Sequence, residues 1–196
     1  MEGFKAVFSN KSAVACLVGT ILSYAAYNFL LTYGVSFLRQ KFLTSKDLTS
    51  VLMMGMGLAF ILGNLVCGRI VKRYSGKTTT VLSTFLVRVL ILSLANVSNL
   101  WLSIILGLIS RLLAGVMITA FSSLTLEQVP MFRGTMMSMS SAAVSLGSTI
   151  GSGVGGLVLL SFDYGILGFI LEFIGIVVAL IFYLFAIDPV RGQSFC

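Results

Sequence analysis

Three charged side chains lie inside long apolar stretches of the sequence, where a buried charge could bind a proton or an opposite charge: Arg88, Arg111 and Glu172. A charge facing lipid costs several kcal/mol, so each should face the protein interior or an opposite charge. Glu172 could take up and release a proton, because burial raises the pKa of a carboxyl group and a nearby arginine lowers it again. The alternative is a static ion pair that holds two helices together, and we place this alternative slightly ahead.

Helical geometry puts the three charges at a similar depth. Arg88 and Glu172 each lie about 8 residues from the outer ends of their apolar segments, and Arg111 lies about 11 residues from its own. At about 1.5 Å per residue, the three depths agree within about 5 Å. Glu172 can therefore reach either arginine.

The composition argues against soluble enzymes and nucleic-acid binders. Of the 196 residues 58% are hydrophobic and 10% are charged, whereas a soluble domain carries about a quarter charged residues. The net charge of +7 comes mostly from short gaps between apolar runs rather than from a basic, aromatic-rich patch. The chain has no histidine, and its three cysteines have no metal-binding spacing, so we expect no metal, no other cofactor and no enzymatic activity.

Apolar runs define the elements that must position the charges. A spanning helix needs about 20 mostly apolar residues. We predict an all-α membrane protein whose residues 1–196 form one domain of six transmembrane helices, at residues 13–38, 48–68, 78–96, 100–124, 134–162 and 164–185. The loops between them hold about 3–12 residues, too few for a separate catalytic domain, so the function must lie among the helices.

Basic residues divide unequally between the two sides of the predicted bundle. One side carries Lys5, Lys11, Arg69, Lys72, Arg73, Lys77, Arg133 and Arg191, whereas the other carries Arg39, Lys41 and Lys46. Cytoplasmic loops are the ones enriched in lysine and arginine. We therefore expect a multi-pass protein of the cell membrane, embedded in the lipid bilayer, with both termini in the cytoplasm.

Four motifs follow one another along these segments. The second loop contains Gly68, Lys72 and Arg73, the fourth helix carries an Arg-x-x-x-Gly that ends at Gly115, and a Pro-Met-Phe-Arg-Gly loop comes next. The fifth helix is rich in glycine from Gly147 to residue 156. In this order the motifs resemble the major facilitator superfamily, specifically its proton-linked drug-efflux branch. The loop departs from the family pattern, since the family usually has an acidic residue where Lys72 lies and its glycine spacing differs by one.

The resemblance implies one half of a transporter of twelve helices built from two six-helix halves. A short basic segment before the first helix and an end soon after the sixth resemble the C-terminal half. The implied function is proton-coupled transport of a small organic or drug-like molecule by alternating access, together with a second half in a homodimer or a separate chain. The alternative is a non-transporting membrane fragment or assembly partner.

The resemblance also suggests roles for individual residues. It places the first helix along a central cavity, which makes Tyr24 and Asn28 candidates for substrate contact, although an interhelical hydrogen bond explains Asn28 equally well. It places the fourth helix against the sixth, which favours Arg111 over Arg88 as the partner of Glu172.

Small residues recur at helical spacing in the fifth helix. Gly147, Gly151 and Gly155 follow one another every four residues and form a ridge on one face. Such ridges let membrane helices approach closely. We favour this packing role over a role in gating.

Overall fold

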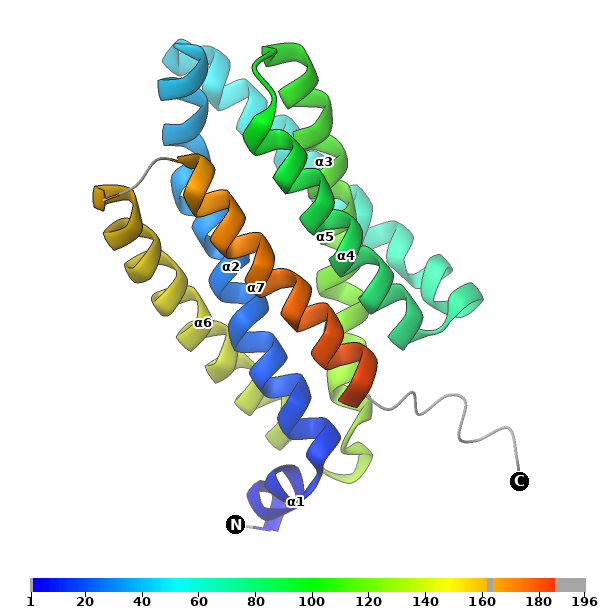
Figure 1. Cartoon of the computed structure of the whole chain (residues 1–196). Coiled ribbons are helices and arrows are strands. Elements are labelled where there is room, and N and C mark those ends of the chain that lie inside the picture. Colours follow the sequence, from blue (N-terminus) through cyan, green and yellow to red (C-terminus); the bar gives the residue numbers. More distant parts are fainter. Residues whose placement is uncertain (1, 162–163, 186–196) are drawn as a thin grey trace.

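The structure is a helical bundle (Figure 1), and the computed structural model describes residues 2–161 and 164–185. The elements in chain order are α1 (Glu2–Ser9), α2 (Lys11–Phe42), α3 (Lys46–Tyr74), α4 (Gly76–Asn96), α5 (Leu100–Glu127), the 3₁₀ turn η1 (Pro130–Phe132), α6 (Arg133–Ser161) and α7 (Tyr164–Phe185). The short helix α1 was not predicted. The helices α2 and α3 continue beyond the apolar runs into basic residues, and Phe162, predicted to end the fifth helix, lies outside the described residues.

Four helices are long and apolar enough to cross a membrane within the described residues: α2, α3, residues 76–94 of α4, and α5. The prediction of an all-helical membrane protein is confirmed at this level. The helix α6 has 29 residues and α7 has 22. Serine and glycine recur throughout α6, which lowers its hydropathy, and in α7 only residues 175–184 form a described apolar stretch.

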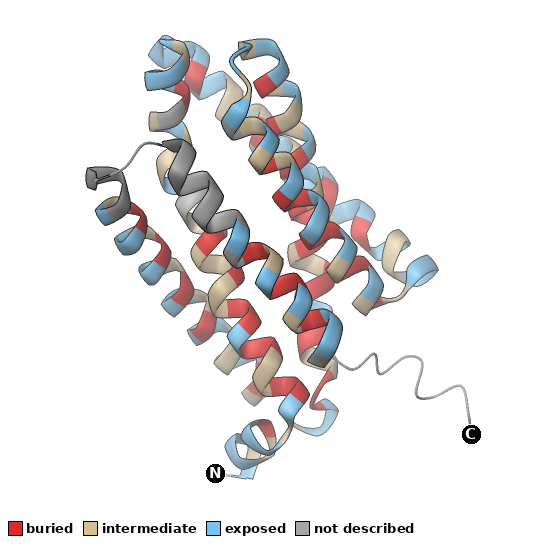
Figure 2. Cartoon of the chain, in the orientation of Figure 1, coloured by how far each residue is buried: buried red, intermediate tan, exposed pale blue. Residues whose placement is uncertain are grey.

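The outer faces of the bundle are apolar. Leu58 and Leu65 of α3 are 56% and 71% exposed, and Phe85 of α4 and Leu180 of α7 are also exposed. Figure 2 shows exposed residues along the outer sides of the helices and buried ones where the helices meet. An apolar surface of this extent requires lipid or another protein around it.

Helix packing in the first half of the chain repeats in the second half. The helix α2 packs against α6 and α7, α5 packs against α3 and α4, and α4 packs against α7. If α2, α3 and α4 are matched in order with α5, α6 and α7, each of these helix–helix contacts has a counterpart: the α2–α6 contact corresponds to α5–α3, and the α2–α7 contact corresponds to α5–α4. The bundle is therefore built from two three-helix units with equivalent contacts.

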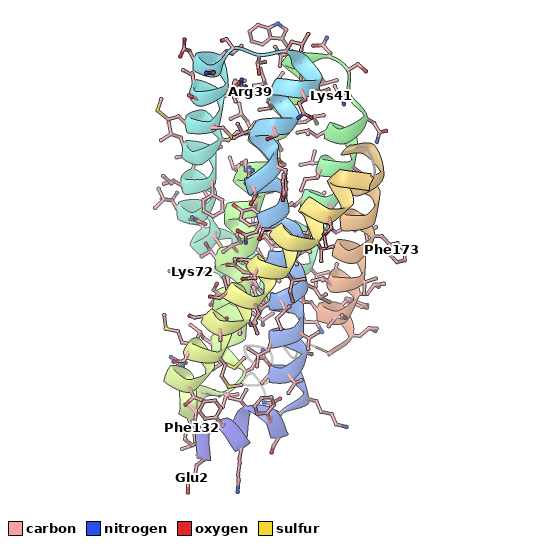
Figure 3. All side chains as sticks on the ribbon, turned by 90° about the vertical axis from the view of Figure 1, so that its left-hand side faces the viewer. Glu2, Arg39, Lys41, Lys72, Phe132 and Phe173 are labelled. Carbon is pink, nitrogen blue, oxygen red and sulfur yellow. The ribbon has the colours of Figure 1, made fainter. Side chains whose placement is uncertain are left out.

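Polar side chains cap the N-termini of two long helices, α2 and α5, at the ends of the bundle. The Asn10 side chain accepts hydrogen bonds from the amides of Ser12 and Ala13 at the start of α2, and Asn99 accepts one from Trp101 at the start of α5. Such caps satisfy amides that have no partner within the helix. The N-terminus and the end of α7 lie at one end of the bundle (Figure 1), and Arg39 and Lys41 lie at the other (Figure 3).

The orientation of the bundle can be tested with reporters. A reporter that is active only in the cytoplasm should be active when it is fused after Cys196 and silent when it is inserted between Asn96 and Asn99, because the basic loops favour the cytoplasmic side. A reporter that is active only outside the cytoplasm serves as the control and should give the opposite pattern. A cytoplasmic signal from the α4–α5 turn would contradict the orientation.

Candidate functional site among the helices

Arg111 lies within a cluster of aromatic rings where α2, α3 and α5 meet. Its side chain is 6% exposed, and its guanidinium carbon lies 5.5 Å from the centre of the Tyr27 ring. Tyr27 also makes an edge-on contact with Tyr24 and a stacked contact with Phe60, with ring centres 6.4 and 6.3 Å apart. A cation over an aromatic face gains about 2 kcal/mol or more when it is desolvated, so the rings stabilise the buried charge.

Two small cavities, of about 10 and 30 Å³, flank the Arg111–Tyr27 contact, and each has room for no more than a few water molecules. One is lined by Tyr24, Tyr27, Thr84 and Met117, with Phe182 of α7, between α2, α4, α5 and α7. Another is lined by Arg111 together with Gly34, Met56, Leu94 and Gly107. The contact between guanidinium and ring therefore lies between two spaces inside the bundle.

Asn28 forms an interhelical hydrogen bond. Its amide nitrogen donates to the Ser148 hydroxyl of α6 at 2.9 Å and to the Tyr24 carbonyl of its own helix at 3.2 Å. One turn further along the same interface, the Tyr33 hydroxyl donates to the Ser152 carbonyl at 3.0 Å. Asn28 is half-buried, so its amide both connects α2 to α6 and keeps some accessible surface.

Arg88 is 2% exposed on α4, and its side chain packs against Gly175 of α7. A Cβ atom at Gly175 would overlap the Arg88 side chain. Glu172 lies three residues before Gly175, and residues three apart share one face of a helix. The Glu172 side chain lies outside the described residues, but its position on α7 is adjacent to the one that Arg88 covers.

The expected contact between α5 and α7 is present in the described residues but limited. The helix α7 packs mainly along α4 and α2. The helices α5 and α7 meet through Phe121 and Phe182, whose ring centres lie 4.8 Å apart. The argument that favoured Arg111 over Arg88 as the partner of Glu172 therefore loses its basis.

Glycines hold two helix pairs at short distance. A Cβ atom at Gly147 or Gly151 would overlap the carbonyl oxygens of Ile21 and Ala25 on α2, and Gly155 is buried on the same helix. Gly63 of α3 and Gly115 of α5 likewise allow their two helices to approach closely. A Cβ atom at either glycine would overlap the backbone of the other helix. The sequence analysis did not single out Gly63, although Gly55, Ala59 and Gly63 follow one another every four residues and offered the same small-residue signal as the fifth helix.

The basic segment predicted as a loop forms the end of α3 and is open to its surroundings. Lys72 and Arg73 are exposed, and a Cβ atom at Gly68 would meet nothing within 4 Å. Ser75 joins the two helices with φ 75° and ψ 154°, a conformation that glycine favours. Ser75 is thus the position whose backbone conformation would suit a glycine, and the glycine of this segment, Gly76, lies one residue later. Within the described residues, no group of three or more histidine, cysteine or acidic side chains could hold a metal ion.

The chain matches the model of a known protein family. The family model described as Major Facilitator Superfamily matches residues 16–195, which is nearly the whole chain. No curated protein matches the chain.

Proposed function

The chain belongs to the Major Facilitator Superfamily, and we propose that it transports a small organic, drug-like molecule across the cell membrane as one half of a twelve-helix permease. The family consists of secondary transporters of several membrane spans, and this membership supports transport rather than enzymatic catalysis as the function. The direction of transport in this proposal is efflux driven by a proton gradient. The proposal includes six spans, with α6 and α7 crossing the bilayer alongside the four apolar helices.

The Arg111–Tyr27 contact is the observation that carries this proposal. It lies where α2, α3 and α5 meet, between two cavities, and its parts are an aromatic face and a cation. Groups of both kinds are suited to contact with an organic molecule, since an aromatic substrate can stack on a tyrosine ring and an anionic or π-rich group can interact with a guanidinium. The flanking cavities of about 10 and 30 Å³ are too small for such a molecule, so the helices would have to move apart to admit it. A substrate that competes for the Tyr27 face would loosen α5 from α2, and such a change at the site could be passed on to the movement of one half against the other on which alternating access depends.

A second six-helix unit completes the proposed transporter. The outward face of α6 carries four hydroxyl side chains at helical spacing, at the exposed residues Ser138, Ser141, Ser145 and Thr149. Each of them except Ser141 donates a hydrogen bond to the carbonyl one turn back. Polar residues in membrane helices usually lie in a protein interior or along a cavity, which favours burial of this face against another half, either a second copy or a separate N-terminal half.

Transport by purified protein in vesicles tests the proposal. With an imposed pH gradient, the wild-type protein should move ethidium, an amphipathic organic probe, and Arg111→Gln should slow this movement at least about tenfold, because the cation–π contact is lost. Arg39→Gln is the matched control. It removes an exposed arginine at the C-terminal end of α2 and should leave transport unchanged.

Two further measurements separate the parts of the proposal. Arg111→Lys, which keeps the cation, should retain more transport than Arg111→Gln, and both variants should stay monodisperse. Crosslinking in the vesicles should show a pair of six-helix units. Transport by a monomer would overturn the half-transporter reading, and an assembled pair that moves no probe under either direction of the gradient would overturn the proposed substrate class.

A further inference from the structure

A groove of about 780 Å³ runs along the outside of the bundle between α4 and α7. Its walls along most of its length are apolar, with Leu82 and Phe85 on α4 and Ile176 and Leu180 on α7. Leu82, Phe85 and Leu180 are 56%, 47% and 53% exposed. The groove therefore opens toward the lipid and does not belong to the Arg111 site inside the bundle.

One end of the groove is polar and cationic. Ser75, Lys77 and Thr78 line it on the α4 side, and Tyr183 lines it on the α7 side. The Lys77 ammonium lies 5.8 Å from the centre of the Tyr183 ring, which holds the charge at the mouth of the groove. Figure 1 shows this end of α4 and α7 on the same side of the bundle as the N-terminus, the side that the basic loops assign to the cytoplasm.

The order of these groups along the groove matches an amphiphile. From Lys77 to Phe85 the helix rises about 12 Å, from the membrane interface into the hydrocarbon region. A cation with neighbouring hydroxyls thus comes first and an apolar channel follows. The nearby Lys72 and Arg73 add positive charge outside the groove, and the chain as a whole carries 13 basic against 6 acidic residues.

We propose that this groove binds an anionic phospholipid of the cytoplasmic leaflet, with the phosphate at Lys77 and one acyl chain between α4 and α7. Lys77 supplies the charge, and the Thr78 hydroxyl, which accepts a hydrogen bond from the Ser75 hydroxyl, lines the same end of the groove as a hydrogen-bond donor. Basic pockets between transmembrane helices on the cytoplasmic side are typical binding sites for anionic head groups. The lipid would stabilise the contact between α4 and α7, which is also the contact that contains Arg88 and Gly175.

Native mass spectrometry of the protein in micelles with equal amounts of phosphatidylglycerol and phosphatidylcholine tests this proposal. The wild-type protein should retain phosphatidylglycerol preferentially. Lys77→Gln should lower the preference about fivefold, the effect expected for one lysine near a membrane surface. Lys72→Gln is the matched control, because Lys72 is exposed and does not line the groove, and it should change the preference little.

Three further arms make the result decisive. Lys77→Arg should keep the preference, which separates loss of charge from loss of folding. Leu180→Trp should block the channel and lower the retention of both lipids, whereas inorganic phosphate should not displace phosphatidylglycerol, because phosphate alone lacks the acyl chain. Equal losses for Lys77→Gln and Lys72→Gln, or displacement by phosphate, would overturn the proposal and leave only general electrostatic attraction or an anion site.

Discussion

Replacing Gly151 by valine should disrupt the packing of α2 against α6 and lower the free energy of unfolding by at least about 1–3 kcal/mol, the usual cost of overpacking. A Cβ atom at this position would overlap the Ala25 carbonyl oxygen, and backbone cannot move aside as a flexible side chain can. The two helices would have to separate along their length. The separation would also break the Asn28–Ser148 hydrogen bond, which lies less than one turn away.

Gly153→Val on the same helix is the matched control. A Cβ atom at Gly153 would meet nothing within 4 Å, so the same substitution should be nearly neutral there or slightly stabilising. Unfolding in SDS, followed by circular dichroism, measures both variants. Equal destabilisation by the two substitutions would show that valine acts through helix propensity rather than through the α2–α6 interface.

The sequence alone was sufficient to predict those properties that depend on amino-acid composition and on the order of motifs along the chain. Long uncharged runs such as residues 13–38 predicted the helices, because a spanning helix must satisfy its backbone internally and expose apolar side chains to lipid. The resemblance to the major facilitator superfamily is confirmed by the family match. The glycine repeat at Gly147 and Gly151 predicted a close helix contact, and the structure places both residues against the α2 backbone.

Properties that depend on which helices are neighbours were harder to predict. Depth along the membrane normal made Arg88 and Arg111 equivalent partners for Glu172, and only the packing of α7 on α4 distinguishes them. The Phe60 contribution to the Arg111 cluster was invisible for the same reason, since one phenylalanine in an apolar helix carries no pattern. The short helix α1 was missed because eight residues are too few for a clear period.

The packing of Arg88 over Gly175 leads us to propose that Arg88, rather than Arg111, pairs with Glu172. Neutralising one member of a buried pair leaves the other charge stranded, which typically costs about 3–5 kcal/mol. Arg88→Gln and Glu172→Gln should therefore each destabilise the protein strongly. The double variant should recover part of the loss, with a coupling of about 0.5–3 kcal/mol in a double-mutant cycle.

The same cycle with Arg111→Gln and Glu172→Gln is the control. The losses in free energy of unfolding from the two single variants should add in this cycle. Arg111 interacts with the Tyr27 ring, and its helix is not a main packing partner of α7. Coupling in the Arg111 cycle together with additivity in the Arg88 cycle would reverse the assignment. Both cycles are measured by unfolding in SDS under the same conditions.

Transport by the Arg88→Gln, Glu172→Gln double variant then separates the two roles of the carboxylate. We expect the variant to keep moving the probe under a pH gradient, because a static pair between α4 and α7 can be replaced by two neutral amides without loss of coupling. Retained binding of the probe with loss of its dependence on the pH gradient would instead assign the coupling proton to Glu172. A proton carrier needs access to each side of the membrane in turn. The Arg88 side chain covers Gly175, on the face of α7 that Glu172 shares. The position of Glu172 on α7 therefore favours the static pair.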